Sequence, residues 1–475
     1  MATTLFNNAE LPDFLGDPRD GGLGGGGGGG DGLGGGGGGD IGSGGGGGGT
    51  GGGGTGGTGT PDEKPLTEMQ FDEGGNLVVA YGQHLVAGHL IQYDYSVGPP
   101  PATKFIAALG EGPWDSVVKA YYAGEEITAS PDGTTAGYHF HPGTISTGIA
   151  DPVQGEDSFF TSPPTYSRTA YAAVLLSADQ SVEERPDKFR AICHCLEVAD
   201  YNTSGVVTDA GSYSANPARV AADVLNRAGL LSSIHWPTWV TWRDYCDATI
   251  TWGARSIPRF ECHLALTQPV DIPTALSFIT QTACTFWQFD GVHIRFLATF
   301  DATLVQPGNQ VYTFTEANCR NVIAGAGDRR GLPTGYIARF RDLDDDYMSE
   351  VTVEYYSEEL ETLVGAANRI EIQLPPMYRS QAERICYWRL QLDGWSNIEV
   401  ELTAFGGSSK VLAGDLIAIE HEVLDFTNDS TTRYLICTET EDLPEESGPS
   451  LRRIRGKIIY GGQLYWDGAH TAPPA

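Results

Sequence analysis

The sequence predicts a multidomain, mainly β protein with short helices, a variant of the α+β class. From about residue 66 onward, apolar residues alternate with polar ones or run in short stretches between glycines, as in strands joined by turns. Three segments instead show helical spacing behind a capping residue. The 475 residues, 40% hydrophobic and 10% aromatic, are enough for about three or four domains with real cores.

The first globular part is expected to consist of strands. Residues 75–97 and 103–127 hold apolar stretches separated by glycines. Within the second stretch, Gly112–Pro113 predicts a turn between two strands, because Gly and Pro interrupt regular structure. A second turn is expected at Ala123–Gly124.

The first helix is predicted in residues 211–230. Asn216 is a good N-cap, Pro217 occupies the first helical position, where its missing N–H costs nothing, and Gly229 is placed to end the helix. The apolar stripe consists of Val220, Ala221, Val224, Leu225 and Ala228. The polar positions expected to face away from it are Arg219, Asp223, Asn226 and Arg227. A stripe this narrow is expected to pack on a sheet or barrel.

A second helix is expected to open at Asp271, with Pro273 in its first turn. The apolar residues that it is expected to bury are Leu276, Ile279 and Ala283. After it, Asp290–Gly291 predicts a two-residue hairpin turn. The strand that follows is expected to place Val292, Ile294 and Phe296 on one face.

A third helix is predicted in residues 378–392, with Ser380 and Glu383 at the spacing of a capping box. Its predicted buried face consists of Ala382, Ile385, Cys386 and Leu390. Apolar residues then alternate with polar ones over 398–404. A tight turn at Ala413–Gly414–Asp415 is expected to lead into a strand over 416–424.

Residues 21–59 are almost pure glycine. Such a segment is expected to be a flexible tether with a mean span of about 35 Å. It joins the globular part to an apolar patch made of Leu5, Phe6, Leu11, Phe14 and Leu15. Two interpretations remain open, a passive spacer or an arm that orders against neighbouring subunits.

The chain is strongly acidic, with 61 Asp and Glu against 29 Lys and Arg, a formal net charge of −32. Stable nucleic-acid binding is not expected, because affinity for DNA rests on cations that neutralise phosphates. Two interpretations of the charge are open. It provides solubility alone, or it forms a surface that repels phosphates so that DNA can pass without binding.

No membrane-spanning segment and no signal peptide are expected, so the chain is expected to be made and assembled in a cytoplasm. Its cysteines are expected to be free, mostly buried thiols: Cys193, Cys195, Cys246, Cys262, Cys284, Cys319, Cys386 and Cys437.

Residues that could carry chemistry are sparse. His139 and His141 share a strand face, and so do the thiols of Cys193 and Cys195, yet neither pair has the further ligands of a metal site or iron–sulfur cluster. Residues 261–263 (ECH) add no firm ligand set. Residues 341–350 (RDLDDDYMSE) lack the glycine and distant glutamate of a calcium loop and are expected to form a solvated acidic loop. No nucleophile elbow, zinc-protease or phosphate-loop motif is present. We therefore predict no catalytic, metal or cofactor site and no enzymatic activity.

Several stretches resemble, in order and spacing, the tail hub proteins of long-tailed phages. This family includes the tip attachment protein of lambda-like phages, the hub of gene transfer agents and baseplate hubs. The resemblance begins at residues 105–127 and 138–144 and covers roughly residues 65–430. The later matching stretches are Thr169–Leu175, Asn216–Leu225, Tyr245–Asp247, Arg259–Leu266, Gln381–Ile385 and Leu412–Ile417. The structural motif residues that it indicates are Gly112, Pro113, Gly124, Asn216, Pro217, Asp223, Gln381, Glu383, Gly414 and Asp415.

The resemblance implies a structural virion protein at the tail tip of a siphophage. Family hubs are homotrimers in which two related β-barrels per subunit, with smaller α+β domains, mimic six-fold symmetry. Such a ring joins the tail tube and distal tail proteins to three-fold tip or fibre proteins. Its channel passes DNA, and the tape-measure protein, during host entry. The Gly-rich arm lies outside this resemblance, and we hypothesise that it threads along the channel or docks on a neighbouring tail protein.

The resemblance and composition together predict a division of the chain into segments. These are 1–60, an N-terminal segment with the Gly-rich arm; 61–200, a first hub β-barrel; 201–300, an α+β hub domain; 301–400, a second hub β-barrel; and 401–475, a C-terminal β hub segment. Insertion of one domain into another would make some of these segments discontinuous.

Other functions remain open. The first alternative is a receptor-binding or adhesion protein of the tail tip, in which Trp239, Trp242 and Trp252 would line a saccharide surface. The absence of fibronectin-like modules or a long fibre in the last residues of this sequence argues against direct receptor binding. A tail-associated cell-wall hydrolase is a weaker alternative. A secreted, non-viral β protein is disfavoured by the lack of a signal peptide and by the unpaired thiols.

Overall fold

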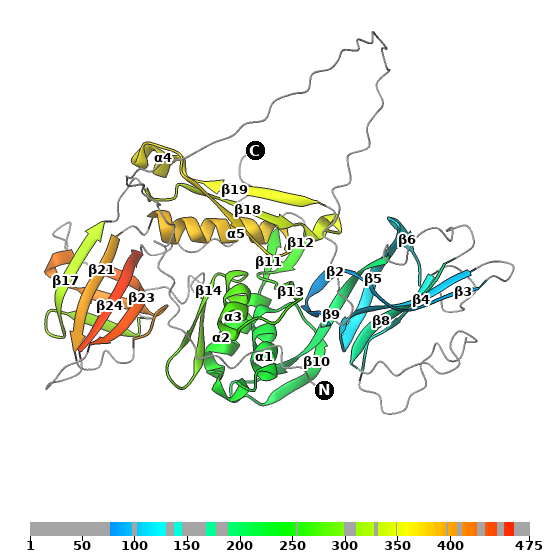
Figure 1. The fold of residues 1–475 in the computed structure, drawn as a ribbon. Coiled ribbons are helices and arrows are strands. Elements are labelled where there is room, and N and C mark those ends of the chain that lie inside the picture. The colour runs from blue at the N-terminus through cyan, green and yellow to red at the C-terminus, as the bar shows by residue number, and fades with distance from the viewer. Residues whose placement is uncertain are drawn as a thin grey trace, which may run out of the picture. The chain divides into compact units, whose positions relative to one another are not determined.

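The computed structural model describes residues 77–96, 102–129, 137–144, 168–176, 189–252, 255–298, 310–326, 331–347, 349–395, 398–405, 411–424, 433–443 and 451–459. The predicted N-terminal patch and Gly-rich arm lie outside the described residues. The described part is mainly β, with five short α-helices distributed among several sheets (Figure 1). The predicted fold class is thereby confirmed.

Two sheets form the first part of the described chain. Their strands are β2 (Gln83–Ala87), β3 (His89–Ser96), β4 (Ala102–Glu111), β5 (Trp114–Tyr122), β6 (Glu125–Ile127), β7 (Gly137–His141), β8 (Thr169–Leu176), β9 (Phe189–Tyr201) and β10 (Val207–Tyr213). One sheet has the order β10-β9-β5-β6, with β2 also paired to β9, and the other has the order β3-β4-β8-β7. The ring of Phe105 on β4 packs against Tyr122 and Phe189 of the other sheet, at 6.3 Å and 6.0 Å between centroids. The two sheets therefore share a core.

The predicted turns of this region are confirmed. Gly112–Pro113 separates β4 from β5 and has a cis peptide bond. Ala123–Gly124 separates β5 from β6, and both residues have positive φ angles.

A helical region follows, made of α1 (Pro217–Arg227), α2 (Trp236–Asp247) and α3 (Ile272–Gln281). α1 packs against α2, α3 and β9. Strand β1 (Val79–Tyr81) pairs with β13 (Leu264–Leu266), which joins the start of the globular chain to this region. Two short hairpins complete it, β11 (Thr249–Trp252) with β12 (Arg255–Pro258), and β14 (Thr285–Phe289) with β15 (Ile294–Ala298).

The hairpin turn after the second predicted helix differs from the prediction. Phe289 pairs with Ile294, so the turn has four residues, 290–293, in place of two. The carboxylate of Asp290 accepts hydrogen bonds from the backbone N–H groups of Val292 and His293, which stabilises this longer turn. Val292 therefore lies in the turn, 66% exposed, and does not share the strand face with Ile294 and Phe296, which are both buried.

The next unit is a three-stranded sheet of order β19-β18-β20, with α5 packed on it. Its elements are β18 (Gly335–Arg341), β19 (Glu350–Tyr356), α4 (Glu358–Val364), β20 (Arg369–Gln373) and α5 (Arg379–Leu390). The four residues predicted as the buried face of α5 are all buried. The predicted capping box is wrong, because Tyr378 occupies the N-cap position and Ser380 already lies inside the helix.

The last sheet has six strands in the order β16-β22-β23-β24-β21-β17. They are β16 (Tyr312–Thr315), β17 (Cys319–Ala326), β21 (Ile398–Phe405), β22 (Leu416–Glu420), β23 (Arg433–Leu443) and β24 (Leu451–Ile459). β16 and β17 stand at opposite ends of this order although only residues 316–318 separate them in sequence. The sheet therefore curls like a half-barrel, around an apolar core of its own. The unit containing α5 is inserted in sequence between its second and third strands.

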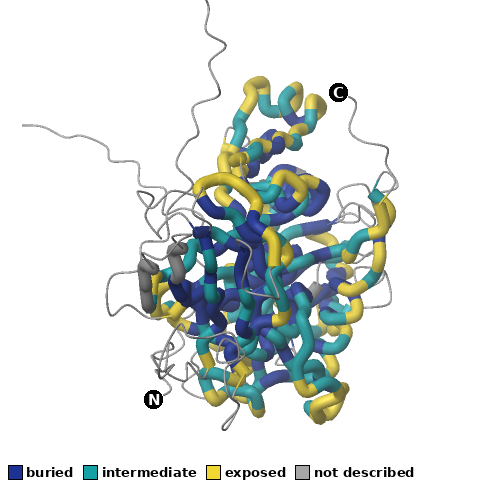
Figure 2. Tube along the Cα trace, turned by 90° about the vertical axis from the view of Figure 1, so that its right-hand side faces the viewer, coloured by how far each residue is buried: buried dark blue, intermediate teal, exposed yellow. Residues whose placement is uncertain are grey.

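Burial follows this architecture. In Figure 2, buried positions run along the strands and helices, and exposed positions gather at turns. Within the part of the chain that the structure describes, no helix combines the length and apolar character needed to cross a bilayer.

Candidate functional site

Polar residues of α1 form a network with neighbouring strands. The sequence predicted only that these residues would face away from the apolar stripe of the helix. Tyr81 on β1 donates its hydroxyl to Asp223, at 2.8 Å. Arg227 donates to the same carboxylate at 2.7 Å and to Glu111, at the end of β4, at 2.8 Å. Burial, together with the charge of Asp223, raises the pKa of Tyr81 well above its usual value. α1 thus connects to β1 and β4 through charged groups as well as through its apolar stripe.

The start of α1 is fixed as predicted. The side-chain oxygen of Asn216 accepts from the N–H of Ala218 at 2.8 Å, and Pro217 follows as the first helical residue. The amide of Asn216 also donates to the carbonyl of Arg243 on α2, at 3.0 Å. Asp200 on β9 pairs with both Arg219 and Arg243, at 3.0 Å and 2.9 Å. Asn216 therefore caps α1 at the place where α1, α2 and strand β9 meet.

Helix α2 was not predicted, because its residues 236–247 are rich in Trp and Thr, which are weak helix formers. Its aromatic side chains are core residues. Trp239 and Trp242 are both 0% exposed; Trp239 donates to the carbonyl of Ala218 at 2.7 Å, and Trp242 stacks on Phe296 at 4.6 Å between centroids. Trp252 is half-buried and packs against the same core. The suggestion that these tryptophans line a saccharide surface is therefore wrong for Trp239 and Trp242.

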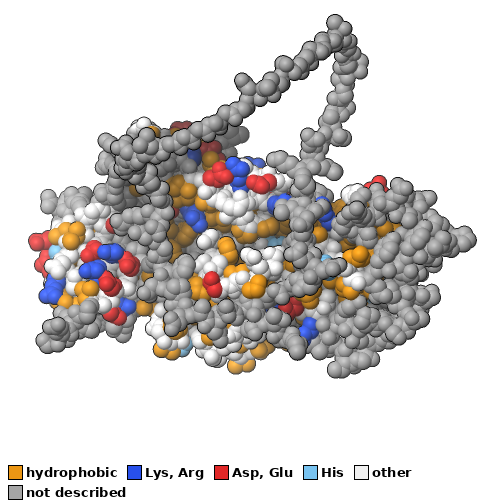
Figure 3. All heavy atoms as spheres, in the orientation of Figure 1, with side chains coloured by type: hydrophobic (Ala, Val, Ile, Leu, Met, Phe, Trp, Pro, Cys, Tyr) orange, Lys and Arg blue, Asp and Glu red, His pale blue; other side chains and the backbone are white. Residues whose placement is uncertain are grey.

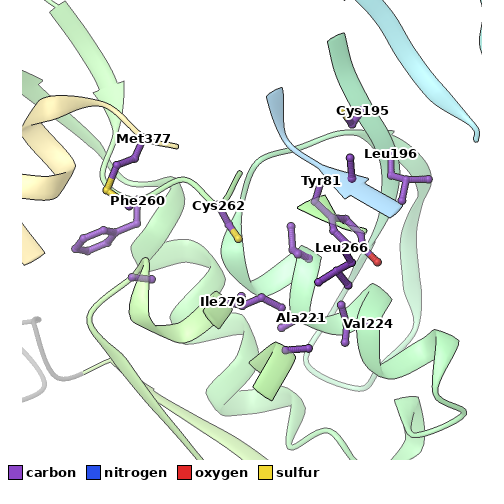
Figure 4. Close-up of a cluster of buried hydrophobic side chains, with 14 of the residues drawn as sticks. Tyr81, Cys195, Leu196, Ala221, Val224, Phe260, Cys262, Leu266, Ile279 and Met377 are labelled. Atoms are coloured by element: carbon purple, nitrogen blue, oxygen red, sulfur yellow. The ribbon is translucent and has the colours of Figure 1, made fainter. Parts of the chain in front are cut away.

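Apolar packing completes the surroundings of α1. In Figure 4, Tyr81 and Leu266, from the β1–β13 pair, lie beside Ala221 and Val224 of α1. Of the predicted stripe, Val220, Ala221, Val224 and Leu225 are buried. Ala218 and Ala222 are buried too, since α1 has neighbours on more than one side. The predicted stripe residue Ala228 is only partly buried.

The two motif residues on α5 have different contacts, and Gln381 is the one that joins this helix to the helical region. The amide nitrogen of Gln381 donates to the carbonyls of Glu261 and Thr282, at 2.7 Å and 2.8 Å, and its oxygen accepts from the N–H of Glu261 at 3.1 Å. Glu383 pairs with Arg379 at 3.1 Å, and burial raises the pKa of its carboxyl group. The neighbouring Arg384, not predicted, is 1% exposed and donates to the carbonyl of Arg259 at 2.5 Å. Burial lowers its pKa to about 10.

The three glycine motif residues lie at turns, where glycine is needed for lack of space, for a positive φ angle or for both. A Cβ on Gly112 would lie 2.3 Å from the carbonyl oxygen of Pro142, so only glycine fits there. Gly414 has φ +87°, and a Cβ there would lie 2.8 Å from Leu297. Gly124 has φ +88° but open surroundings, so it serves backbone conformation alone. After Gly414, the buried side chain of Asp415 accepts from the N–H of Leu412 at 2.8 Å.

The histidines and cysteines weighed as metal ligands are packed into the fold. His141 stacks on Tyr171 at 4.3 Å between centroids. All eight cysteines are buried and free; burial raises the pKa of Cys262 to about 12 and raises those of Cys193 and Cys195 as well. Among the described residues, no group of three or more His, Cys, Asp or Glu is placed to hold a metal ion.

A buried histidine pair was missed by sequence reasoning. Gln83 donates its backbone N–H to the ring of His263 at 2.9 Å, and the other ring nitrogen lies 3.5 Å from Glu261. Burial, with His263 nearby, lowers the pKa of His84 to about 3, so this ring is neutral. The two histidines are far apart in sequence and become neighbours because β1 pairs with β13.

The acidic loop after β18 is solvated only in part: Asp344 and Asp345 are exposed as predicted, but other residues of the loop are packed. Leu343 and Tyr347 are buried, and Asp346 pairs with Lys119 on β5. The available sequence signal is that Leu343 and Tyr347 stand at either side of the three consecutive aspartates 344–346.

Next to α4 lies an open depression of about 780 Å³. Arg369, in its wall, pairs with Glu354 at 2.6 Å and with Glu361, and its guanidinium lies 4.4 Å from the ring centroid of Tyr356. With Glu358 also lining it, the depression is acidic, and its arginine is already neutralised.

No protein-family model matches the chain, and no curated protein matches its sequence. Among solved structures, a chain from the virion of a native gene transfer agent particle is similar, with a TM-score of 0.58 and 14% identity. The match covers 85% of this chain and 89% of that one. The two chains share a fold.

Two more distant structures are described as tail proteins. A tail protein from Neisseria meningitidis MC58 has a TM-score of 0.34 at 9% identity, over 81% of this chain and 100% of that one. The 43 kDa tail protein of prophage MuSo2 from Shewanella oneidensis has a TM-score of 0.32 at 9% identity, over 82% of this chain and 99% of that one. These two likenesses are too weak to carry an argument about this chain.

Proposed function

We propose that this chain is a structural virion protein, a homotrimeric hub that joins a six-fold tail tube to a three-fold tail tip. The fold shared with the gene transfer agent virion chain, over most of both molecules, is the observation that carries this proposal. The ordered motifs of the sequence resemblance support it independently. In this function the ring would bind distal tail proteins on one side and tip or fibre proteins on the other. It would pass DNA, and the tape-measure protein, through its channel.

The chemistry of the described residues supports a framework function. The residues indicated by the resemblance cap helices, form turns or join elements through backbone carbonyls, as Asn216, Gly112 and Gln381 do. A structural adaptor needs rigid geometry of this kind and no reacting group.

The distribution of charge supports passage of DNA without binding. Over the six-stranded sheet, Arg453 and Arg455 on β24 pair with Glu401 on β21, at 3.3 Å and 2.8 Å, and with Glu441 and Glu439 on β23, at 2.5 Å and 2.8 Å. Figure 3 shows side chains of both signs gathered over this sheet. Cations that are already paired offer little to phosphates, and the net charge of −32 repels them.

The domain division is part of the proposal. We assign the first hub barrel to segment 61–200 and the α+β domain to 201–300. For the second barrel we take the six-stranded sheet as its centre, with strands drawn from both 301–400 and 401–475. The N-terminal segment 1–60 is proposed to contact neighbouring subunits or tail proteins.

Electron microscopy of the purified full-length chain at high concentration, averaged without imposed symmetry, tests the trimer. Rings with three-fold symmetry and a central hole are expected. Antibody labelling of isolated tails that contain the chain tests its position, and label at the end distal to the head is expected. Label on the head, or along the tube, would overturn the proposal.

The receptor-binding alternative has a separate test. Fluorescently labelled full-length chain is mixed with host cells, and the bound fraction is measured. A hub buried between tube and tip gives no saturable binding, whereas saturable binding that a host-surface saccharide competes away would favour the alternative. Burial of Trp239 and Trp242 removes two of the three tryptophans that suggested it, whereas Trp252 is only half-buried.

A further inference from the structure

The loop between β18 and β19, residues 342–347, contacts a sheet that lies more than a hundred residues earlier in the chain. Leu343 and Tyr347 are 5% and 2% exposed and form an apolar cluster with Ile192 of β9, separate from the main core. Leu85 of β2 and Tyr121 of β5 pack against this cluster. The loop therefore attaches the three-stranded unit with α5 to the β10-β9-β5-β6 sheet.

Polar contacts surround this small cluster. Asp346 pairs with Lys119 on β5 and accepts from the hydroxyl of Tyr121 at 3.2 Å. Tyr347 donates its hydroxyl to the carbonyl of Gln83 on β2 at 2.5 Å. On another side, Asp344 pairs with Arg255 of β12 at 2.5 Å. These contacts join the loop to β5 and β2 of one sheet and to β12 of the helical region.

The loop backbone adopts a costly conformation. Asp346 and Tyr347 are consecutive and have φ +46° and +65°, in the left-handed region that non-glycine residues avoid. The N–H of Tyr347 donates to the carbonyl of Asp342 at 3.2 Å, and Arg341 donates to the carbonyl of Tyr347 at 3.4 Å. Contacts with the sheet must maintain this conformation, so loss of those contacts favours its relaxation.

The ion pairs that hold the loop are partly exposed to solvent, so they can break without unfolding the protein. The Lys119 and Asp346 side chains are 37% and 34% exposed, and those of Arg255 and Asp344 are 63% and 45% exposed. Exposed ion pairs contribute little each and are screened by salt. The loop also brings four aspartates together, and burial with the neighbouring carboxylates of Asp344 and Asp345 raises the pKa of Asp342. Mutual repulsion among them opposes the docked state.

We propose that residues 342–347 are a releasable latch between the β10-β9-β5-β6 sheet and the β18–β20 unit with α5. In the latched state Lys119, Tyr121 and the carbonyl of Gln83 hold the loop. In the released state the loop leaves the sheet while both units keep their own packing. The latch does not rest on the hub function, and its test uses the purified chain alone.

Hydrogen–deuterium exchange of the full-length chain, followed by mass spectrometry, tests the latch. In Lys119→Met we expect amide exchange in residues 342–347 and in β2 to become about twofold to fivefold faster. Exchange in α1 and in the six-stranded sheet is expected to stay at wild-type rates. In wild type, about 1 M NaCl is expected to give the same local acceleration, because the Debye length falls to about 3 Å.

Two controls separate a latch from general loosening. Lys119→Arg keeps the charge and is expected to keep slow exchange in the loop. Arg339→Met removes an exposed ion pair with Glu371 inside the three-stranded sheet, and no change in the loop is expected. Unchanged loop exchange in both Lys119→Met and high salt overturns the latch. So does acceleration that is equal in Arg339→Met or uniform along the chain.

Discussion

Asp415 shows how a single buried carboxylate controls a turn. Its side chain is 3% exposed and accepts the N–H of Leu412, while Gly414 before it supplies the left-handed conformation that the turn needs. Burial raises the pKa of Asp415, although the hydrogen bond from Leu412 and the charges of Arg295 and Arg452 act in the opposite direction. The fold therefore favours the protonated side chain relative to its state in the unfolded chain.

This shift predicts a pH-dependent gain from Asp415→Asn. The unfolded pKa is about 3.9, so the stability contributed by Asp415 is fully present below that pH and is lost as pH rises through the raised folded pKa. Asparagine keeps an oxygen for the N–H of Leu412 and carries no charge. We expect the free energy of unfolding at pH 7 to increase by less than about 2 kcal/mol, and the difference to vanish near pH 4.

Urea unfolding at pH 7 and pH 4 measures this difference. Glu399→Gln serves as the control, because Glu399 is exposed on β21 of the same sheet, and little change at either pH is expected. If the Asp415→Asn variant were less stable than wild type at pH 7, the attraction of Arg295 and Arg452 for the charged carboxylate would outweigh the cost of burying it.

At the scale of elements, α1 and α5 begin in different ways although the sequence predicted a side-chain cap for both. Asn216 accepts the N–H of Ala218 and has non-helical backbone angles. Tyr378 at the start of α5 makes no such bond, and the Oγ of Ser380 is buried without a protein hydrogen-bond partner. The packing of α5 on its sheet, rather than a cap, holds that helix start.

Asn216→Ala and Ser380→Ala are therefore expected to differ in their effect on the free energy of unfolding. The first loses the cap and the bond to the carbonyl of Arg243, and we expect a loss of about 1 to 2 kcal/mol in the free energy of unfolding. The second removes a buried unsatisfied hydroxyl and is expected to be neutral or slightly stabilising. Chemical denaturation of both variants beside wild type measures the contrast. Equal losses in the two would reinstate the capping box at Ser380.

At the scale of the whole molecule, elements distant in sequence are joined by a few charged side chains. Arg227 on α1 contacts Asp223 in its own helix and Glu111 at the end of β4, while Tyr81 of β1 donates to Asp223. Tyr81 is buried and the three charged side chains are partly buried, so these pairs are less screened by salt than surface pairs. The network connects the helical region, which includes the β1–β13 pair, with the β3-β4-β8-β7 sheet.

Arg227→Met is expected to weaken this connection. It leaves Glu111 and Asp223 without a cation in a half-buried place, and we expect a loss of about 1 to 3 kcal/mol. Thermal or urea unfolding measures it. Arg339→Met, which breaks an exposed pair, is the matched control and is expected to change stability by less than about 1 kcal/mol. Equal effects of the two substitutions would contradict a special contribution of the network.

The sequence by itself determined the fold class and the turns at Gly112–Pro113 and Gly414. Of the five α-helices that the structure describes, it also predicted α1 with its cap Asn216 and α3, where the side chain of Asp271 accepts from the N–H of Thr274. These depend on neighbours along the chain, on glycine, proline and capping side chains, and on the period of apolar residues. The buried face of α5 was also predictable, because its apolar spacing is local.

Only the tertiary structure decided which residues meet across the chain. Burial of Trp239 and Trp242, the histidine pair, the junction at Gln381 and the docking of residues 342–347 depend on strand pairings such as β1 with β13. The six-stranded sheet likewise pairs strands that lie on either side of the α5 unit in the sequence. Strand order and register arise from packing between distant segments, and no local pattern of residues encodes that choice.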